Sequence, residues 1–194
     1  MKRFFTLLLL AIFVTGIQAQ QKVTLRDIAQ GTYRAQGISG LKPMLDGEHY
    51  TQISSDHKRI VKYSFKTGEE VGTLFDVTTA RDCDLKSFDD YILSPDEKLI
   101  LIQTETNPIP RHSFTAVYYI YNVKNNKMEP LSNNGPQQVP LFSPDGNQIA
   151  FVRNNNIYLV KLLFGNSESQ VTKDGEYNHV LNGIPDWVYE EEFS

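Results

Sequence analysis

Cysteine is almost absent from this chain of 194 residues, because Cys83 is the only one. One thiol cannot form an internal disulfide, so other interactions must hold the fold together. A cysteine nucleophile needs a histidine partner and a low thiol pKa. Cys83 stands between Asp82 and Asp84, whose carboxylates disfavour the thiolate. We therefore predict a structural role for Cys83.

Recognisable catalytic motifs are absent as well. There is no Gly-x-Ser-x-Gly nucleophile elbow, since the segment Gly37 to Gly40 has the wrong spacing. The four histidines are scattered without zinc-binding spacing, and no glycine-rich phosphate loop occurs. We predict that the chain contains no catalytic residue, no metal site and no cofactor site.

The chain also lacks a basic surface. It has 19 Lys and Arg residues against 23 Asp and Glu residues, a formal net charge of −4. Removal of Lys2 and Arg3 with the leading segment would change this to 17 against 23, or −6. Nucleic-acid-binding domains carry the opposite charge, so we expect no nucleic-acid partner.

The leading apolar run is too short for a membrane span. Phe4 to Val14 covers 11 residues, fewer than a bilayer core of roughly 30 Å requires of a helix. Lys2 and Arg3 precede this run and Ala19 follows it, which is the pattern of a cleaved signal peptide. We predict a signal peptide over residues 1–19 and export to a bacterial periplasm, or secretion to the cell surface or beyond. The alternative is an uncleaved anchor.

Residues 20–44 lead into the strand-rich part of the chain. Thr24 to Gln30 is predicted to be a short helix that Thr24 caps, with Gly31 just past its end. From Leu45 onward the pattern changes to short strands and turns. The predicted regions are therefore 1–19, 20–44 and 45–194.

What the sequence does contain is an internal repeat. The turn Ser94-Pro95-Asp96 recurs as Ser143-Pro144-Asp145, and the two serines are 49 residues apart. A weaker copy begins at Asp46-Gly47, 50 residues before Asp96-Glu97. Two strand-like runs follow each strong copy, first Leu99 to Gln103 and Thr115 to Tyr121, then Ile149 to Val152 and Asn156 to Leu162. Hairpin-type turns are predicted at Asn125-Asn126 and at Lys173-Asp174-Gly175.

A repeat of about 50 residues with several short strands per unit is typical of a β-propeller blade. An open antiparallel sandwich is the alternative, but the recurring strand order favours blades. About three blades fit between Leu45 and Ser194, whereas propellers typically close with four to eight. We predict an all-β fold that is a partial β-propeller.

Near the end of the chain, three glutamates follow two large aromatic residues in the run Asp186 to Glu192. Pro185 and Asp186 can start a short helical turn, on which Glu191 and Glu192 could flank one small cation. The aromatic side chains would then pack beneath the turn. Like charges so close are costly unless a cation meets them. A solvated acidic turn is the alternative.

This Asp-Trp-Val-Tyr-Glu-Glu-Glu run resembles the signature of the dipeptidyl peptidase IV family, in the prolyl oligopeptidase group of serine peptidases. The resemblance extends from about Val23 to Ser194, through Asp46 to Tyr50, Arg111 to Ser113 and Asn154 to Tyr158. In the family, the last two glutamates of the signature bind the substrate's terminal ammonium. That role maps onto Glu191 and Glu192, and Glu190 is left without a substrate contact.

The resemblance also implies an architecture and an activity. The family's propeller has eight blades and is followed by an α/β-hydrolase domain, so we expect this sequence to be the N-terminal part of a longer protein. The implied activity is that of an exported serine-type dipeptidyl peptidase, which releases dipeptides with Pro or Ala at the second position. The partners would be peptides with a free amino terminus. Whether the full-length parent is a homodimer stays open.

Arg111 is the third candidate site residue. Its context, Arg-His-Ser-Phe-Thr-Ala, is similar to the family segment whose arginine contacts the substrate carbonyl near the amino terminus. A planar, permanently charged guanidinium suits this task because it donates several fixed hydrogen bonds. A solvated surface arginine is the alternative.

Two other functions remain open. One is a prolyl tripeptidyl peptidase of the same group, in which the ammonium site lies one residue further from the nucleophile. The other is a non-catalytic propeller that binds peptide amino termini or a protein partner.

Overall fold

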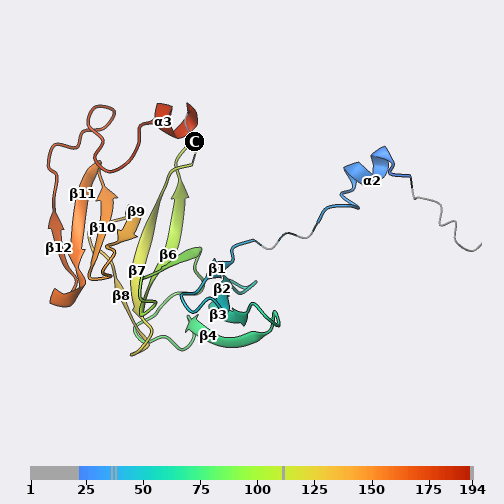
Figure 1. The fold of residues 1–194 in the computed structure, drawn as a ribbon. Coiled ribbons are helices and arrows are strands. Elements are labelled where there is room, and N and C mark those ends of the chain that lie inside the picture. The colour runs from blue at the N-terminus through green and yellow to red at the C-terminus, as the bar shows by residue number, and fades with distance from the viewer. Residues whose placement is uncertain (1–21, 36, 38, 111, 193–194) are drawn as a thin grey trace, which may run out of the picture. The chain divides into compact units, whose positions relative to one another are not determined.

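The computed structural model describes residues 22–35, 37, 39–110 and 112–192, and the chain divides into two units, residues 1–39 and 40–194. The first unit contains helix α2 (Leu25–Ala29) (Figure 1). Thr24 caps it as predicted, because its hydroxyl accepts a hydrogen bond from the Asp27 N–H at 3.2 Å and its own N–H donates to the Asp27 carboxylate at 3.0 Å. The predicted signal segment lies outside the described residues. Among the described helices, none has the length and apolar character of a membrane span.

The second unit contains three four-stranded antiparallel sheets in which consecutive strands are neighbours (Figure 1). The first sheet consists of β1 (Lys42–Pro43), β2 (His49–Ile53), β3 (Arg59–Ser64) and β4 (Glu70–Asp76). The second consists of β5 (Asp90–Leu93), β6 (Leu99–Pro108), β7 (Phe114–Asn122) and β8 (Lys127–Pro130). The third consists of β9 (Gln138–Phe142), β10 (Gln148–Arg153), β11 (Asn156–Lys161) and β12 (Ser167–Gln170). A 3-10 turn, η1 (Leu162–Phe164), and helix α3 (Trp187–Glu192) complete the described elements. The all-β, three-blade prediction is confirmed.

The second sheet lies between the other two, and both of its faces are buried. Ile100 and Ile102 of β6 belong to a core shared with the first sheet, whereas Leu101 belongs to a core shared with the third. All three side chains are fully buried. Successive side chains of a strand point to opposite faces, so a strand covered on both sides needs an unbroken apolar run. This explains why the sequence Leu-Ile-Leu-Ile begins β6.

The repeated Ser-Pro-Asp turns connect the first two strands of the second and third sheets. The Ser94 hydroxyl donates to the Asp96 carboxylate at 2.8 Å and accepts from the Leu99 N–H at 2.9 Å. Ser143 makes the same pair of bonds, with Asp145 at 2.5 Å and with the N–H five residues later at 3.0 Å. The serine hydroxyl thus joins the aspartate inside the turn to the backbone N–H just after it, which is the local reason for the repeat.

The weaker copy at Asp46-Gly47 occupies the corresponding β1–β2 turn of the first sheet. The structure adds a copy that the 50-residue spacing does not reveal, in the β2–β3 turn. There the Ser54 hydroxyl donates to Asp56 at 2.6 Å and accepts from the Arg59 N–H at 2.9 Å. The serine–aspartate turn therefore occurs in the first sheet too, but between its second and third strands.

Two smaller predictions have different outcomes. Cys83 is half-buried against the core of the first and second sheets, and burial together with Asp84 and Asp76 raises its pKa, in agreement with a structural role. The predicted hairpin turn at Lys173 to Gly175 is wrong. The tight turn lies further along the chain, where Glu176 and Val180 form an isolated bridge. Gly175 instead donates its N–H to the Asn156 side chain at 3.0 Å, so it serves close packing against the third sheet.

Candidate functional site

The acidic run forms helix α3, and Asp186 caps it as predicted. One carboxylate oxygen of Asp186 accepts from the N–H groups of Val188 and Tyr189, each at 3.0 Å, and its carbonyl accepts from the Glu190 N–H at 3.1 Å. Two of the four N–H groups that a helix leaves unpaired at its start are therefore satisfied by one side chain. The cap fixes where the helix begins and hence where its glutamates stand.

The expected packing of the aromatic residues beneath α3 is wrong. Trp187 and Tyr189 are 64% and 62% exposed. Residues two apart on a helix point about 200° away from each other, so the two rings cannot both rest on one surface. They instead border a groove of about 760 Å³ that the loop before α3 also lines, with lining residues Asn178, His179, Leu181, Ile184, Pro185, Asp186, Trp187, Val188 and Tyr189.

The second part of the site is the hairpin between β6 and β7, which extends beyond the buried part of the second sheet. The first half of β6 is buried, and the strand becomes exposed from Glu105 to Pro108. The change coincides with a bulge between Thr104 and Asn107, where Glu105 has a φ of 50°. The tip is closed by a hydrogen bond of 2.8 Å from the Ile109 N–H to the Ser113 carbonyl.

A hydrogen-bond network holds the base of this hairpin. The Asp89 carboxylate accepts from the N–H and the hydroxyl of Thr106, at 3.0 and 2.7 Å. Gln103 donates to the same Thr106 hydroxyl at 2.8 Å and accepts from the buried Tyr118 hydroxyl at 3.0 Å. Burial raises the pKa of Tyr118, so its phenol stays a donor. The hairpin therefore rises from a fixed base.

Glu190 joins the two parts of the site. Its carboxylate accepts a hydrogen bond of 2.6 Å from the Ser113 hydroxyl, although the two residues are 77 positions apart in the sequence. Figure 1 shows α3 beside the outer end of β6 and β7. Ser113 comes two residues after Arg111, so the structure brings the predicted arginine segment and the predicted glutamate run together.

The three predicted site residues are placed to different degrees. Glu191 and Glu192 both lie in the last turn of α3, and Glu192 is exposed. The side chain of Glu191 and all of Arg111 lie outside what the structure describes. Among the described residues, no group of three His, Cys, Asp or Glu side chains could hold a metal ion. The described part of the site offers the carboxylates of Glu190 and Glu192 on one short helix beside an exposed hairpin.

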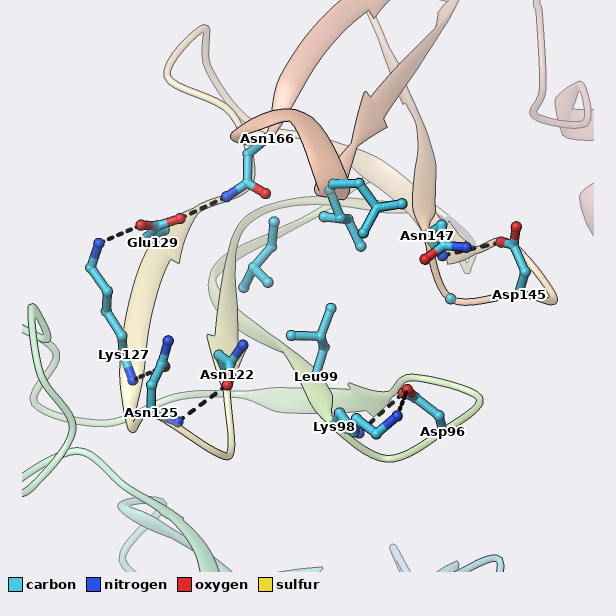
Figure 2. Close-up of a pocket in the computed structure, with 14 residues that line it drawn as sticks. Asp96, Lys98, Leu99, Asn122, Asn125, Lys127, Glu129, Asp145, Asn147 and Asn166 are labelled. Atoms are coloured by element: carbon cyan, nitrogen blue, oxygen red, sulfur yellow. Dashed lines mark hydrogen bonds and ion pairs between the residues drawn. The ribbon is translucent and has the colours of Figure 1, made fainter.

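A second concave region, a cleft of about 350 Å³, lies between the second and third sheets (Figure 2). Four of its five charged side chains form two ion pairs, and the fifth, Asp145, accepts hydrogen bonds from the Ser143 hydroxyl and the Asn147 N–H. Glu129 accepts from Lys127 at 2.5 Å and from Asn166 at 2.7 Å, so it connects β8 to the turn before β12. Asp96 pairs with Lys98 at 2.9 Å, and this pair together with Ser94 lowers the pKa of Asp96 to about 2. Of these contacts, the bond from Asn166 to Glu129 crosses from the third sheet to the second.

Comparison with known proteins places the chain in a family. Residues 94–194 match the sequence model of the dipeptidyl peptidase IV (DPP IV) N-terminal region. The chain belongs to this family. The structure of dipeptidyl peptidase 4 from Porphyromonas gingivalis is similar to it, with 44% sequence identity and a TM-score of 0.78 over 90% of this chain and 25% of that chain.

Curated relatives of this dipeptidyl peptidase IV family chain include eukaryotic proteins. Human prolyl endopeptidase FAP is 34% identical over 172 residues, which are 88% of this chain and 21% of the relative. A probable dipeptidyl-aminopeptidase B from Emericella nidulans is 49% identical over 104 residues, 51% of this chain and 11% of the relative. The chain thus spans about a fifth or less of the length of these curated relatives.

Sequence reasoning misses the role of Glu190 and Ser113. On the sequence alone, Glu190 is only a neighbour of the two ammonium-binding glutamates, and Ser113 has no role. A signal for their contact is present, because Ser113 belongs to the Arg-His-Ser segment and Glu190 to the acidic run, the two segments assigned to one site. The resemblance predicts that these segments meet, but it does not say which atoms join them.

Proposed function

We propose that the protein containing this chain is an exported serine-type dipeptidyl peptidase. It removes dipeptides, with Pro or Ala at the second position, from peptides that have a free amino terminus. The nucleophilic serine and its partners would belong to a hydrolase domain outside residues 1–194. The single observation that carries the proposal is the 2.6 Å hydrogen bond between Ser113 and Glu190, because it joins the glutamate helix to the hairpin of Arg111.

The proposed mechanism divides the work between the domains. Glu191 and Glu192 bind the substrate's ammonium group, and Arg111 donates hydrogen bonds to the first carbonyl region. With the chain end held in one register, the serine reaches only the bond after the second residue. Selectivity then comes from a fixed distance between the ammonium site and the nucleophile, which is catalysis by proximity and orientation.

Charge removal at the two glutamates tests this mechanism. Glu191→Gln and Glu192→Gln keep the side-chain shape and remove one charge each. In the proposed complex the substrate covers the two carboxylates, and loss of one partner of such a buried charge pair costs about 2–5 kcal/mol. The kcat/KM for a free-amino dipeptidyl amide should therefore fall roughly 30- to several-thousand-fold. Labelling by a small fluorophosphonate, which needs the serine but not the ammonium site, should be unchanged. Wild-type kcat/KM in both variants would refute the ammonium site.

Arg111 has its own pair of variants. Arg111→Ala should lower kcat/KM, and Arg111→Lys should restore little of it if the planar fork matters more than the charge. Full rescue by lysine would show that the position supplies charge alone.

A second candidate function follows from the human relative, which is named a prolyl endopeptidase. An endopeptidase cleaves inside a chain and does not require a free amino terminus. Peptides with a proline bond far from both ends separate the two candidates, because a dipeptidyl peptidase leaves them intact.

The export proposal is supported by the leading segment of the sequence. If residues 1–19 are removed on export, amino-terminal sequencing of the exported protein should begin at Gln20.

A further inference from the structure

We propose that Glu190 is a positioning residue, which fixes α3 against the β6–β7 hairpin through Ser113 and so sets the location of the ammonium-binding glutamates. The inference rests on the proposed function and deepens it. It assigns a function to Glu190, the one glutamate of the three for which no substrate contact is proposed.

The contact has the geometry of a strong hydrogen bond. The Ser113 hydroxyl and the Glu190 carboxylate are 2.6 Å apart, the range expected when a hydroxyl donates to an ionised acceptor. Both side chains are half-buried, so the bond is partly shielded from competing water. A contact that closes 77 residues of chain also constrains the relative placement of two distant segments.

The segments that carry Ser113 and Glu190 are each held by hydrogen bonds of their own. The hairpin of Ser113 is held at its base by the two hydrogen bonds from Thr106 to Asp89. The helix of Glu190 is held at its start by the Asp186 cap. The Ser113–Glu190 bond connects these two anchored segments at the outer end of the second sheet.

Helix α3 depends on this connection because it is short. It has six residues, far below the roughly 12–15 at which isolated helices become even marginally stable in water. Glu191 and Glu192 follow Glu190 directly, so the bond holds the turn from which both of them project. Displacement of a substrate-positioning group by about 1 Å can cost about a hundredfold in rate. A helix released from Ser113 would still carry the two charges but would not hold them in register.

A set of variants of the full-length protein tests the inference, with kcat/KM for a free-amino dipeptidyl amide as the readout. Ser113→Ala and Glu190→Ala should each lower kcat/KM roughly 10- to 100-fold, the range for loss of a hydrogen bond to a charged group. The double variant should have a kcat/KM no lower than that of the more impaired single variant, because both changes remove the same bond. Ser113→Thr keeps the donor and Glu190→Gln keeps the acceptor, so both should stay within about fivefold of wild type.

Two controls separate positioning from a general structural role. Fluorophosphonate labelling should stay at the wild-type rate in Ser113→Ala, and the preference for free-amino over Nα-acetylated substrate should decrease. Ser132→Ala removes a matched serine-to-glutamate bond, to Glu168, and should lower the thermal midpoint without changing kcat/KM.

The remaining outcomes overturn the inference or the proposal beneath it. Additive effects of Ser113→Ala and Glu190→Ala, or wild-type kcat/KM in both, would overturn the positioning role. A Glu190→Gln variant as impaired as Glu191→Gln would show that Glu190 binds the ammonium directly. If Glu191→Gln and Glu192→Gln are fully active, the ammonium site itself is refuted, whatever Ser113 does.

Discussion

The chain uses the same bond, a serine hydroxyl donating to a glutamate, in two regions with different surroundings. In the seam between the second and third sheets, Ser132 donates to Glu168. Glu168 also pairs with Arg153 at 2.5 Å and accepts from Asn134 at 3.3 Å. At the hairpin, Ser113 donates to Glu190 at 2.6 Å, and the acceptor stands at the start of a row of glutamates.

The two regions differ in the side chains that the structure describes around each acceptor. Glu168 has a guanidinium partner, and Arg153 is only 9% exposed and stacks over the Tyr158 ring at 4.0 Å. Removing either member of such a buried pair would leave the other charge uncompensated. The glutamates of α3 form an uninterrupted acidic row, a costly arrangement unless a cation binds there. We infer that the seam stabilises the fold, and we propose that the acidic row of α3 receives a cationic ligand.

The largest effect on stability is expected from Arg153→Met. Removing one partner of a buried ion pair typically costs about 3–5 kcal/mol, because the other charge is left uncompensated. Lys127→Met is the matched control, since its pair with Glu129 is about 40% exposed on both sides and exposed pairs contribute about 0–1 kcal/mol. Urea unfolding of the full-length protein measures both. Equal losses would remove the distinction between the buried ion pair and the exposed one.

Gly175→Ala should have the next largest effect. A Cβ at Gly175 would overlap the backbone carbonyl oxygen of Asn155, which cannot move aside as a flexible side chain could. Overpacking of this kind typically costs about 1–3 kcal/mol. Gly175 lies in the chain between β12 and α3, so the variant should also lower kcat/KM by displacing the helix. A fully stable and active variant would mean that this loop does not position α3.

A smaller effect is expected from the titration of Glu168 in the seam. Burial raises the pKa of Glu168, but hydrogen bonds from Arg153 and Ser132 outweigh burial and hold the pKa below its usual value. A depressed carboxyl pKa contributes stability that is complete above the unfolded value of about 4.3 and is lost as pH falls through the folded value. The stability advantage of wild type over Glu168→Gln should therefore shrink below about pH 4.3. An advantage that persists unchanged under acid conditions would contradict this origin.

The sequence predicts the architecture well because its determinants are local. The Ser-Pro-Asp turns, the apolar run of β6 and the Asp186 cap each depend on residues within a few positions of one another. The family resemblance also assigns Arg111 and the glutamate run to one site. Sequence patterns predict contacts between residues that are close in the sequence, and these features depend on such contacts.

The contacts that the sequence does not predict join residues far apart in the chain. Ser113 and Glu190 are 77 positions apart and Ser132 and Glu168 are 36 apart, so no spacing rule relates them. The predicted aromatic packing beneath α3 is wrong because residues two apart on a helix point in nearly opposite directions, so Trp187 and Tyr189 cannot share one supporting surface. The pairing of neighbouring strands depends on residues close in the sequence. Contacts between different sheets, or between a sheet and a helix, depend on how the whole chain folds.

One comparison tests whether α3 and the β6–β7 hairpin form a site that binds the amino terminus of the substrate. The measurement is kcat/KM of the full-length protein on a Gly-Pro amide substrate and on its Nα-acetylated counterpart. Acetylation removes the ammonium charge and adds bulk, so the acetylated substrate should react at least tens-fold more slowly, in line with the cost of unpairing a buried charge. Comparable kcat/KM values for the two substrates would contradict the proposed ammonium site and would favour cleavage within the substrate peptide.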